Sequence, residues 1–156
     1  MNGLQKRNNW TYQDKIFTEN DIDNNYGFVY IIENTLTNKK YIGKKLFWSS
    51  KTKQVNKKKK RYKAPSDWQD YYGSNEVLKK DIETHGKDNF IRTIIHLCKS
   101  KGECSYLEAK EQFINGVIES DEFYNTWIMV RVRNTHIKDY IERKKNEKSI
   151  SRDEEK

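Results

Sequence analysis

The apolar positions of the chain fall into short segments that are separated by polar turns. Apolar and β-branched residues run from Phe28 to Ile32, the turn-forming sequence "ENTLTNKK" follows, and a second strand resumes from Lys40 to Gly43. This pattern predicts a β-hairpin. A further strand is expected at "FIRTIIHLC", Phe90 to Cys98, which is strongly β-prone and long enough to be a central strand.

Two helices are predicted from apolar stripes and end signals. In "GSNEVLKKDIETHG", Ser74 is the N-cap candidate, apolar residues follow at helical spacing, and Gly86 is the stop. A second helix is predicted from Ser105 to about Glu119, and it begins with a capping box in which Glu108 reaches back to the first free amide. Glu108 is therefore expected to have a structural role.

The element order β-β-α-β-α predicts an α+β fold, a small sandwich with a three-stranded, mostly antiparallel sheet flanked by helices. A chain of 156 residues with 34% hydrophobic content suits one compact domain. We expect an N-terminal extension at 1–25, whose role the sequence does not define. The domain itself is expected at 26–133 with a basic insertion at 44–65, and a charged C-terminal helix and tail at 134–156.

The charge of the chain indicates a polyanionic partner. The formal net charge is +8 and the pI is about 9.3, so nucleic acid is the expected partner. From Lys44 to Lys63 the chain has ten basic residues and no acid, a run expected to be solvated or to lie along phosphates. Phosphate contacts are predicted for Lys57, Lys58, Lys59, Lys60, Arg61 and Lys63, and base stacking for Trp48.

Other classes of protein are disfavoured by the sequence. Cys98 and Cys104 are too few for a disulfide framework, and with His96 they lack the usual metal-ligand spacing, so we expect buried structural thiols. No apolar stretch suits a signal peptide or a membrane span, so no membrane partner is expected. The predicted location is the cytoplasm of a bacterium or of a phage-infected host cell.

With this element order in view, the predicted hairpin resembles the signature of the GIY-YIG nuclease superfamily. Tyr30 in "FVY" and Tyr41 in "YIG" match the family's two tyrosines on adjacent strands, while Phe28 stands where the first motif has glycine. The resemblance continues through "LKKDIETHGKDNF", "EQFI" and "YN", and it spans Tyr26 to Asn125. It implies the superfamily's sandwich fold.

The resemblance implies a divalent-metal-dependent DNA endonuclease that uses Mg²⁺ or Mn²⁺. Glu111 matches the family's metal-binding glutamate, and Asn125 matches an asparagine that orients the metal shell or a neighbouring backbone. The family's arginine-bearing helix has no counterpart. The candidates for the phosphate-binding cation are therefore Lys44, Lys45 and Arg61, and the candidate for the family's histidine is Tyr72.

The residues themselves suit phosphodiester hydrolysis. Tyr30 is expected to accept a proton from the attacking water, provided that nearby positive charge lowers its pKa toward neutrality. Tyr41 would hydrogen-bond the phosphate or share that role, and Glu111 would hold the metal through one carboxylate. Each tyrosine taken singly is equally typical of an ordinary strand.

Other functions stay open. One is a GIY-YIG-like domain that binds nucleic acid without cutting it, and another is a basic structural protein of a phage or nucleoid, which explains the charge but not the hairpin motif. Sequence specificity is left to the insertion, the N-terminal extension, the C-terminal helix or a homodimer partner. The biological role is left among homing, restriction, repair and DNA degradation.

Overall fold

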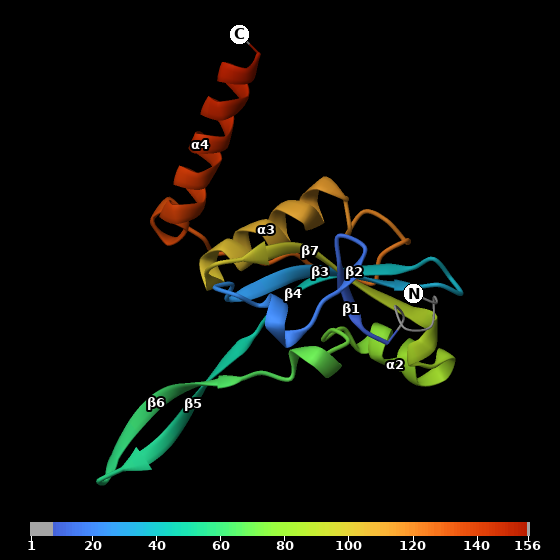
Figure 1. Cartoon of the computed structure of the whole chain (residues 1–156). Helices are drawn as coiled ribbons and strands as arrows, with labels where there is room; N and C mark the ends of the chain where they lie inside the picture. The colour runs from blue at the N-terminus through green and yellow to red at the C-terminus, as the bar shows by residue number, and fades with distance from the viewer. Residues whose placement is uncertain (1–7, 156) are drawn as a thin grey trace.

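A five-stranded mixed sheet forms the centre of the structure, a computed structural model that describes residues 8–155 (Figure 1). The pair β1–β7 is parallel, and the other neighbouring strands are antiparallel. The α+β class is confirmed, whereas the prediction of three strands is wrong. In spatial order the strands are β2 (Lys15–Ile16), β1 (Trp10–Tyr12), β7 (Phe90–Cys98), β3 (Gly27–Asn34) and β4 (Lys40–Leu46).

The two additional strands, β1 and β2, come from the segment that the sequence leaves without a role. They are joined by Gln13 and Asp14, whose positive φ angles of 50° and 65° suit a tight hairpin turn. Trp10 is 2% exposed, and its indole Nε1 donates a hydrogen bond of 2.7 Å to the carbonyl of Trp68. β1 therefore closes the aromatic core from one side. Residues 1–7 of the predicted extension lie outside the described part of the chain.

The helices differ from the predictions at their starts. Asn75, not Ser74, caps α2, since its side-chain oxygen accepts a hydrogen bond from the Leu78 amide at 3.0 Å. The longer helix is capped by Ser100 rather than Ser105. The α-helices are α2 (Glu76–His85), α3 (Lys101–Ile114) and α4 (Lys138–Glu154), and the 3₁₀ turns are η1 (Glu19–Asp21), η2 (Trp68–Asp70), η3 (Lys87–Asn89) and η4 (Asn134–Ile137).

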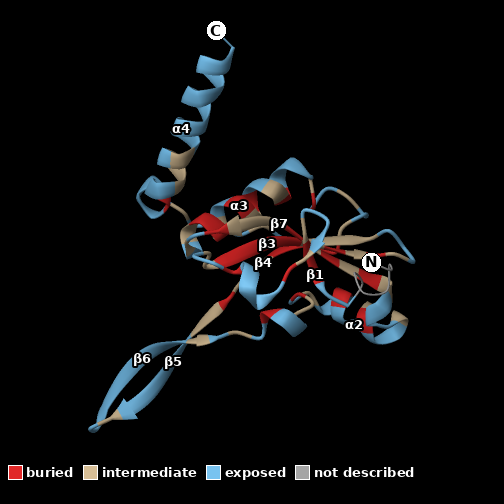
Figure 2. Cartoon of the chain, in the orientation of Figure 1, coloured by how far each residue is buried: buried red, intermediate tan, exposed pale blue. Residues whose placement is uncertain are grey.

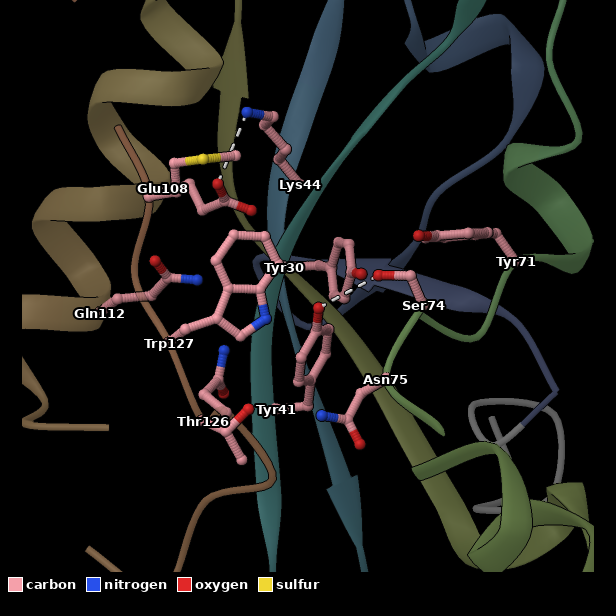
Figure 3. A pocket seen from close by; sticks show the side chains of 12 residues that line it. Tyr30, Tyr41, Lys44, Tyr71, Ser74, Asn75, Glu108, Gln112, Thr126 and Trp127 are labelled. Atoms are coloured by element: carbon pink, nitrogen blue, oxygen red, sulfur yellow. Dashed lines mark hydrogen bonds and ion pairs between the residues drawn. The ribbon is translucent and has the colours of Figure 1, made fainter. Parts of the chain in front are cut away.

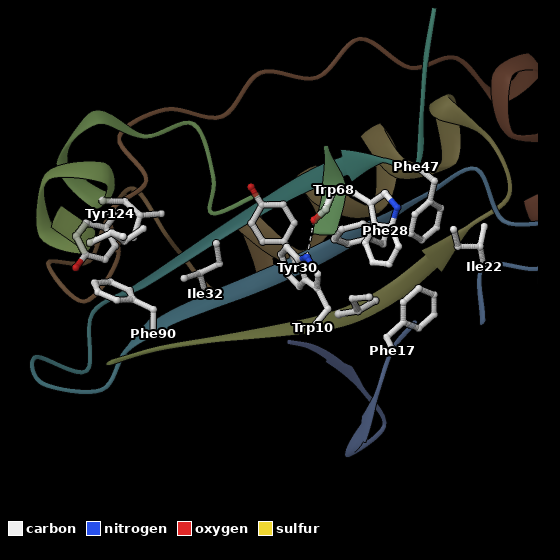
Figure 4. Close-up of a cluster of buried hydrophobic side chains, with 13 residues drawn as sticks. Trp10, Phe17, Ile22, Phe28, Tyr30, Ile32, Phe47, Trp68, Phe90 and Tyr124 are labelled. Atoms are coloured by element: carbon white, nitrogen blue, oxygen red, sulfur yellow. Dashed lines mark hydrogen bonds between the residues drawn. The ribbon is translucent and has the colours of Figure 1, made fainter. Parts of the chain in front are cut away.

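Side chains of β3 alternate between two cores, as the period of two in a strand requires. Val29 and Ile31 face α3 and pack in a smaller core together with the buried, free thiols of Cys98 and Cys104, as predicted. The opposite face packs against η2 and α2 and is dominated by rings (Figure 4). The aromatic core contains Trp10, Phe17, Phe28, Tyr30, Phe47, Trp68, Phe90 and Tyr124.

Two elements project from this body. The insertion, predicted as a solvated basic run, is ordered: β5 (Trp48–Val55) and β6 (Lys58–Pro65) form a separate two-stranded sheet, largely exposed (Figures 1 and 2). Helix α4 projects from another side, and at its base Arg143 Nη2 lies 2.6 Å from Glu103 Oε2 of α3. Within residues 8–155, no helix combines the length and the hydropathy needed to cross a membrane.

We predict that Trp10→Ala lowers the free energy of unfolding by about 3–5 kcal/mol, because it removes a buried ring and leaves a cavity. Urea denaturation measures this difference. Trp127→Ala is the matched control: its side chain is 64% exposed, and the expected change is within about 0.5 kcal/mol. Equal stabilities of the two variants would show that β1 is not part of the core.

Candidate active site

A pocket of about 300 Å³ opens beside β4, the edge strand of the sheet (Figure 3). Because β4 is at the edge, side chains from both faces of the sheet reach this pocket. It is lined by Tyr30, Tyr41, Lys44, Tyr71, Ser74, Asn75, Glu108, Gln112, Asn125, Thr126, Trp127 and Met129.

The glycine of the "YIG" motif makes room for the tyrosine on the neighbouring strand. Tyr30 and Gly43 are direct partners in the β3–β4 ladder. A Cβ atom built on Gly43 would lie 2.5 Å from the Tyr30 hydroxyl oxygen and 2.7 Å from Cζ. Only glycine lets the Tyr30 ring lie across β4 and bring its hydroxyl to the pocket.

Three tyrosines converge at the pocket. The ring of Tyr30 lies 6.2 Å from that of Tyr41 and 6.0 Å from that of Tyr71, between ring centroids. The Tyr41 hydroxyl is 3.4 Å from Ser74 Oγ. Tyr30 is the buried member of the three, and the rings of Tyr41 and Tyr71 pack beside it.

Tyr71, not the predicted Tyr72, is the third ring at the pocket. The Tyr72 ring lies against Arg92, whose guanidinium carbon is 4.0 Å from the ring centroid, and Tyr72 is not among the lining residues. Arg92 Nη1 also donates hydrogen bonds of 2.9 Å to the carbonyls of Gln69 and Tyr71. The buried arginine thus fixes the chain after η2. Nothing in the sequence distinguishes Tyr71 from its neighbour Tyr72, so the sequence alone does not show which of them reaches the pocket.

Both hairpin tyrosines are held as neutral hydroxyls. Burial raises the pKa of Tyr30 well above its ordinary value, and Tyr71, Tyr41 and Glu108 raise it further. Burial also raises the pKa of Tyr41, although its hydrogen bond with Ser74 acts in the other direction. Burial and the neighbouring protein groups therefore favour the neutral form of both hydroxyls, which suits them to donate hydrogen bonds.

Lys44 and Glu108 form an ion pair at the wall of the pocket nearest α3. Lys44 Nζ lies 3.5 Å from Glu108 Oε1 and donates a hydrogen bond of 2.9 Å to Ser105 Oγ. The Glu108 side chain is only 15% exposed, and burial raises its pKa more than Lys44 lowers it. The predicted capping role of Glu108 is wrong, because α3 begins at Lys101 and places Glu108 in its middle.

Glu111 lies outside the pocket. Its Oε1 is 2.8 Å from His96 Nε2 on β7, and its Oε2 accepts from Asn115 Nδ2 at 3.3 Å. Along a helix, three residues fall about 60° short of a full turn and four residues fall about 40° past it, so Glu111 and Gln112 lie on either side of Glu108, about 100° apart. Glu108 and Gln112 therefore share the face toward β4, and Glu111 is turned toward β7.

Asn125 binds the free edge of β4. Its Oδ1 accepts from the Ile42 amide at 3.0 Å, and its Nδ2 donates to the Ile42 carbonyl at 2.8 Å. Gln112 Nε2 donates to the same carbonyl at 3.0 Å. Lys40 continues the contact, since its backbone bonds to Glu122 and Tyr124. The contact of Asn125 is thus with a neighbouring backbone, one of the two roles expected for it.

The remaining predicted residues lie elsewhere. Lys45 Nζ is 2.6 Å from Asp67 Oδ1 and 4.1 Å from the centroid of the Tyr71 ring, and Lys45 does not line the pocket. Arg61 is on the projecting hairpin. The structure brings Tyr30, Tyr41, Lys44 and Asn125 together, and it leaves out Lys45, Arg61, Tyr72 and Glu111. The DNA-contact set Trp48, Lys57, Lys58, Lys59, Lys60, Arg61 and Lys63 lies on the β5–β6 hairpin.

The fold and the β3–β4 hairpin, with one tyrosine on each strand and a glycine beside them, are those of a GIY-YIG domain. A family model described as "Putative endonuclease segE, GIY-YIG domain" matches residues 10–128, a range that includes β1. The protein of that name from Enterobacteria phage T4 is 31% identical over 100 residues, which are 64% of this chain and 40% of the relative.

The chain belongs to the SegE-type GIY-YIG endonuclease family. The aligned region spans about two fifths of the length of the T4 relative. No solved structure matches the chain.

We predict that Glu108→Gln stabilises the protein at neutral pH, because the amide removes a desolvated charge. The native pKa of Glu108 is raised above its ordinary value of 4.5. The stability that the protonated carboxyl contributes to the folded state is therefore complete below pH 4.5 and is lost as the pH rises through the native pKa. In urea denaturation, the stability gain of the variant over the wild type should grow from pH 4 to pH 7. A gain that is the same at both pH values would contradict the assignment.

Gly43→Ala is predicted to cost about 1–3 kcal/mol of stability, because the added methyl group overlaps the Tyr30 ring. The cost should fall by more than about 1 kcal/mol when Tyr30→Ala is already present, since the ring is then gone. A double-mutant cycle of unfolding free energies measures this coupling. Additive costs would show that Gly43 and Tyr30 do not constrain each other.

Proposed function

We propose that the protein is a divalent-metal-dependent endonuclease that hydrolyses phosphodiester bonds of DNA in the pocket beside β4. The observation that carries the proposal is the meeting of Tyr30, Tyr41, Lys44 and Glu108 in one pocket of a GIY-YIG domain. The net charge of +8 supports a polyanionic substrate.

Glu108, rather than Glu111, is our proposed metal ligand. It is a desolvated carboxylate with a raised pKa, and a second cation beside it would add to the stabilisation that Lys44 gives its charge. Oxygen donors suit Mg²⁺ and Mn²⁺, and Mg²⁺ accepts one carboxylate when water and substrate phosphate complete its shell. The described residues that line the pocket include neither histidine nor cysteine, which zinc would prefer. When bound, the ion supplies Lewis-acid stabilisation of the charge that develops on the phosphate.

The chain's own residues then have distinct roles. If a metal ion balanced the charge of Glu108, the ammonium group of Lys44 would be free to bind the phosphate. Tyr30 and Tyr41, kept protonated by burial, donate hydrogen bonds to phosphate oxygens, and one such preorganised donor is typically worth a factor of about 10²–10³ in rate. Gln112 and Asn125 hold the β4 backbone, and with it Tyr41 and Lys44, in place.

A second candidate function is DNA binding without cleavage. The observation that favours it is the Lys44–Glu108 ion pair, since an ammonium group already serves the carboxylate that a metal would need. Metal-dependent cutting separates the two candidates.

Cutting both strands of a duplex with one pocket needs two successive events or a homodimer. Accumulation of nicked plasmid before linear plasmid indicates successive events, and direct formation of linear plasmid indicates a dimer.

We predict that Glu108→Gln lowers the rate of supercoiled-plasmid cleavage in Mg²⁺ or Mn²⁺ by at least about 100-fold, because the ligand charge is lost. Glu111→Gln is the matched control, one turn away on the same helix, and should retain activity within about threefold. Tyr30→Phe should lose activity without loss of DNA binding, which anisotropy measures. If Glu111→Gln lowers the cleavage rate and Glu108→Gln does not, the metal ligand is Glu111. If the protein binds DNA but cuts it under no metal condition, the second candidate function is favoured.

A further inference from the structure

The β5–β6 hairpin is an ordered ribbon that has no core of its own. Asn56 and Lys57 join its strands with φ angles of 48° and 63°, the geometry of the two-residue turns that match strand twist. From Ser50 to Lys63 the side chains are exposed, except for a half-buried Val55 (Figure 2). The ribbon projects away from the sheet that carries the pocket (Figure 1).

The root of the hairpin is firmly held by the body. Phe47, directly before β5, is 1% exposed and packs against Trp68 with a ring-centroid distance of 5.2 Å. Ser66, directly after β6, donates from its backbone to the carbonyl of Phe47 and from Oγ to that of Leu46 at 2.6 Å. A ribbon that is fixed at its root and free along its length can enter a groove in a partner without rearranging the domain.

The ribbon is also electrostatically unbalanced. Lys53 and Lys60 are direct cross-strand partners, and like charges in that position destabilise a hairpin that is marginal without a core. No acid lies between Trp48 and Pro65 to offset them. A polyanion is therefore the partner that this ribbon fits. Its cations are Lys51, Lys53, Lys57, Lys58, Lys59, Lys60, Arg61 and Lys63.

The two faces of the ribbon differ in chemistry, because cross-strand partners share a face and alternate along the strands. One face pairs neutral hydrogen-bonding side chains with cations, and the other carries lysines around Tyr62. The first face has Ser50 with Lys63, Thr52 with Arg61, and Gln54 with Lys59; the second has Lys51 with Tyr62, Lys53 with Lys60, and Val55 with Lys58.

Duplex DNA fits the ribbon better than a single strand does. The major groove, about 12 Å wide, admits a two-stranded β-ribbon, whose strands are about 4.8 Å apart. Arginine and lysine suit the guanine edge there, and glutamine suits adenine. Single-strand binding relies on rows of aromatic rings, whereas the exposed length of this ribbon has one ring, Tyr62.

We propose that the β5–β6 hairpin enters the major groove of duplex DNA, with Thr52, Gln54 and Arg61 toward the base edges and the lysines of the other face reaching the flanking phosphates. In this arrangement the ribbon determines which DNA sequence the domain binds. The ribbon would then also determine where the strand is cut, an inference that rests on the proposed nuclease function. The binding mode itself does not rest on that function.

Fluorescence anisotropy with random-sequence duplexes tests the phosphate contacts, and the full chain with Glu108→Gln keeps the DNA uncut. Lys53→Gln/Lys60→Gln should weaken binding to all duplexes and flatten the slope of log K against log salt by about 1.8, or about 0.9 per lost contact. Lys145→Gln/Lys148→Gln on α4 is the charge-matched control and should keep the parent slope. An unchanged slope for the hairpin variant would overturn the proposal.

Base reading is tested with the same parent protein. Selection from a random duplex pool should enrich a sequence, and methylation of guanine N7 in the major groove of that sequence should weaken binding at least tenfold. Gln54→Ala/Arg61→Ala should lose both effects while keeping most of its affinity for random DNA. No enrichment, indifference of the parent to N7 methylation, or tighter binding to single strands would each overturn major-groove reading.

The interference experiment needs no hairpin variant, so a variant that unfolds the hairpin does not remove the test. Cleavage is scored separately on the protein with its native Glu108. If N7 methylation weakens binding but the DNA stays intact, the nuclease proposal is wrong and the hairpin proposal stands. If the DNA is cut, and neither the rate nor the position of cutting changes in any hairpin variant, the hairpin proposal is wrong and the nuclease proposal stands.

Discussion

The covering of the outer edge of β4 is the interaction on which the rest of the site depends. An edge strand exposes unpaired amides and carbonyls, and in this protein the side chains of Gln112 and Asn125 bind those of Ile42. Gln112 thereby fixes the rotation of α3, and Asn125 fixes the chain that returns along β4. Since Glu108 is one turn before Gln112, the same bonds place its carboxylate against Lys44.

The pocket contains groups whose burial lowers the stability of the folded protein, compared with the same groups at an exposed surface. A carboxylate is held where burial outweighs its lysine partner, and a tyrosine hydroxyl is buried among two other tyrosines. The backbone has also given up a side chain at Gly43 to admit that tyrosine. Such costs are typical of sites that bind a charged ligand, where the ligand supplies the missing interactions.

Much of the fold follows from the sequence, because strong periodic signals mark its long elements. The β3–β4 hairpin, β7 and α2 have period-two or helical patterns, and the two tyrosines follow from the hairpin. The strands β1 and β2 cannot be predicted in this way, because strands of three and two residues are stabilised by tertiary contacts such as the burial of Trp10. The lysine-rich hairpin has no alternation of apolar residues to reveal it.

The choice between Glu108 and Glu111 as the proposed metal ligand depends on where α3 begins. Ser100 and Ser105 are both followed by a glutamate three residues later, so the sequence alone offers two capping boxes for α3. With Ser105 as the cap, Glu108 has a capping role, and the resemblance places the metal ligand at Glu111. The helix begins at Lys101, and the side-chain bonds to Ile42 then decide which glutamate faces β4. Only the three-dimensional packing contains that information.

Anomalous diffraction from crystals soaked in Mn²⁺ tests the location of the metal most directly. We predict a peak in the pocket beside β4, within coordination distance of a carboxylate oxygen of Glu108. The pair of His96 on β7 and Glu111 on α3, whose Nε2 and Oε1 are 2.8 Å apart, offers a competing imidazole and carboxylate site. A peak at that pair, with none at Glu108, would contradict the proposed centre.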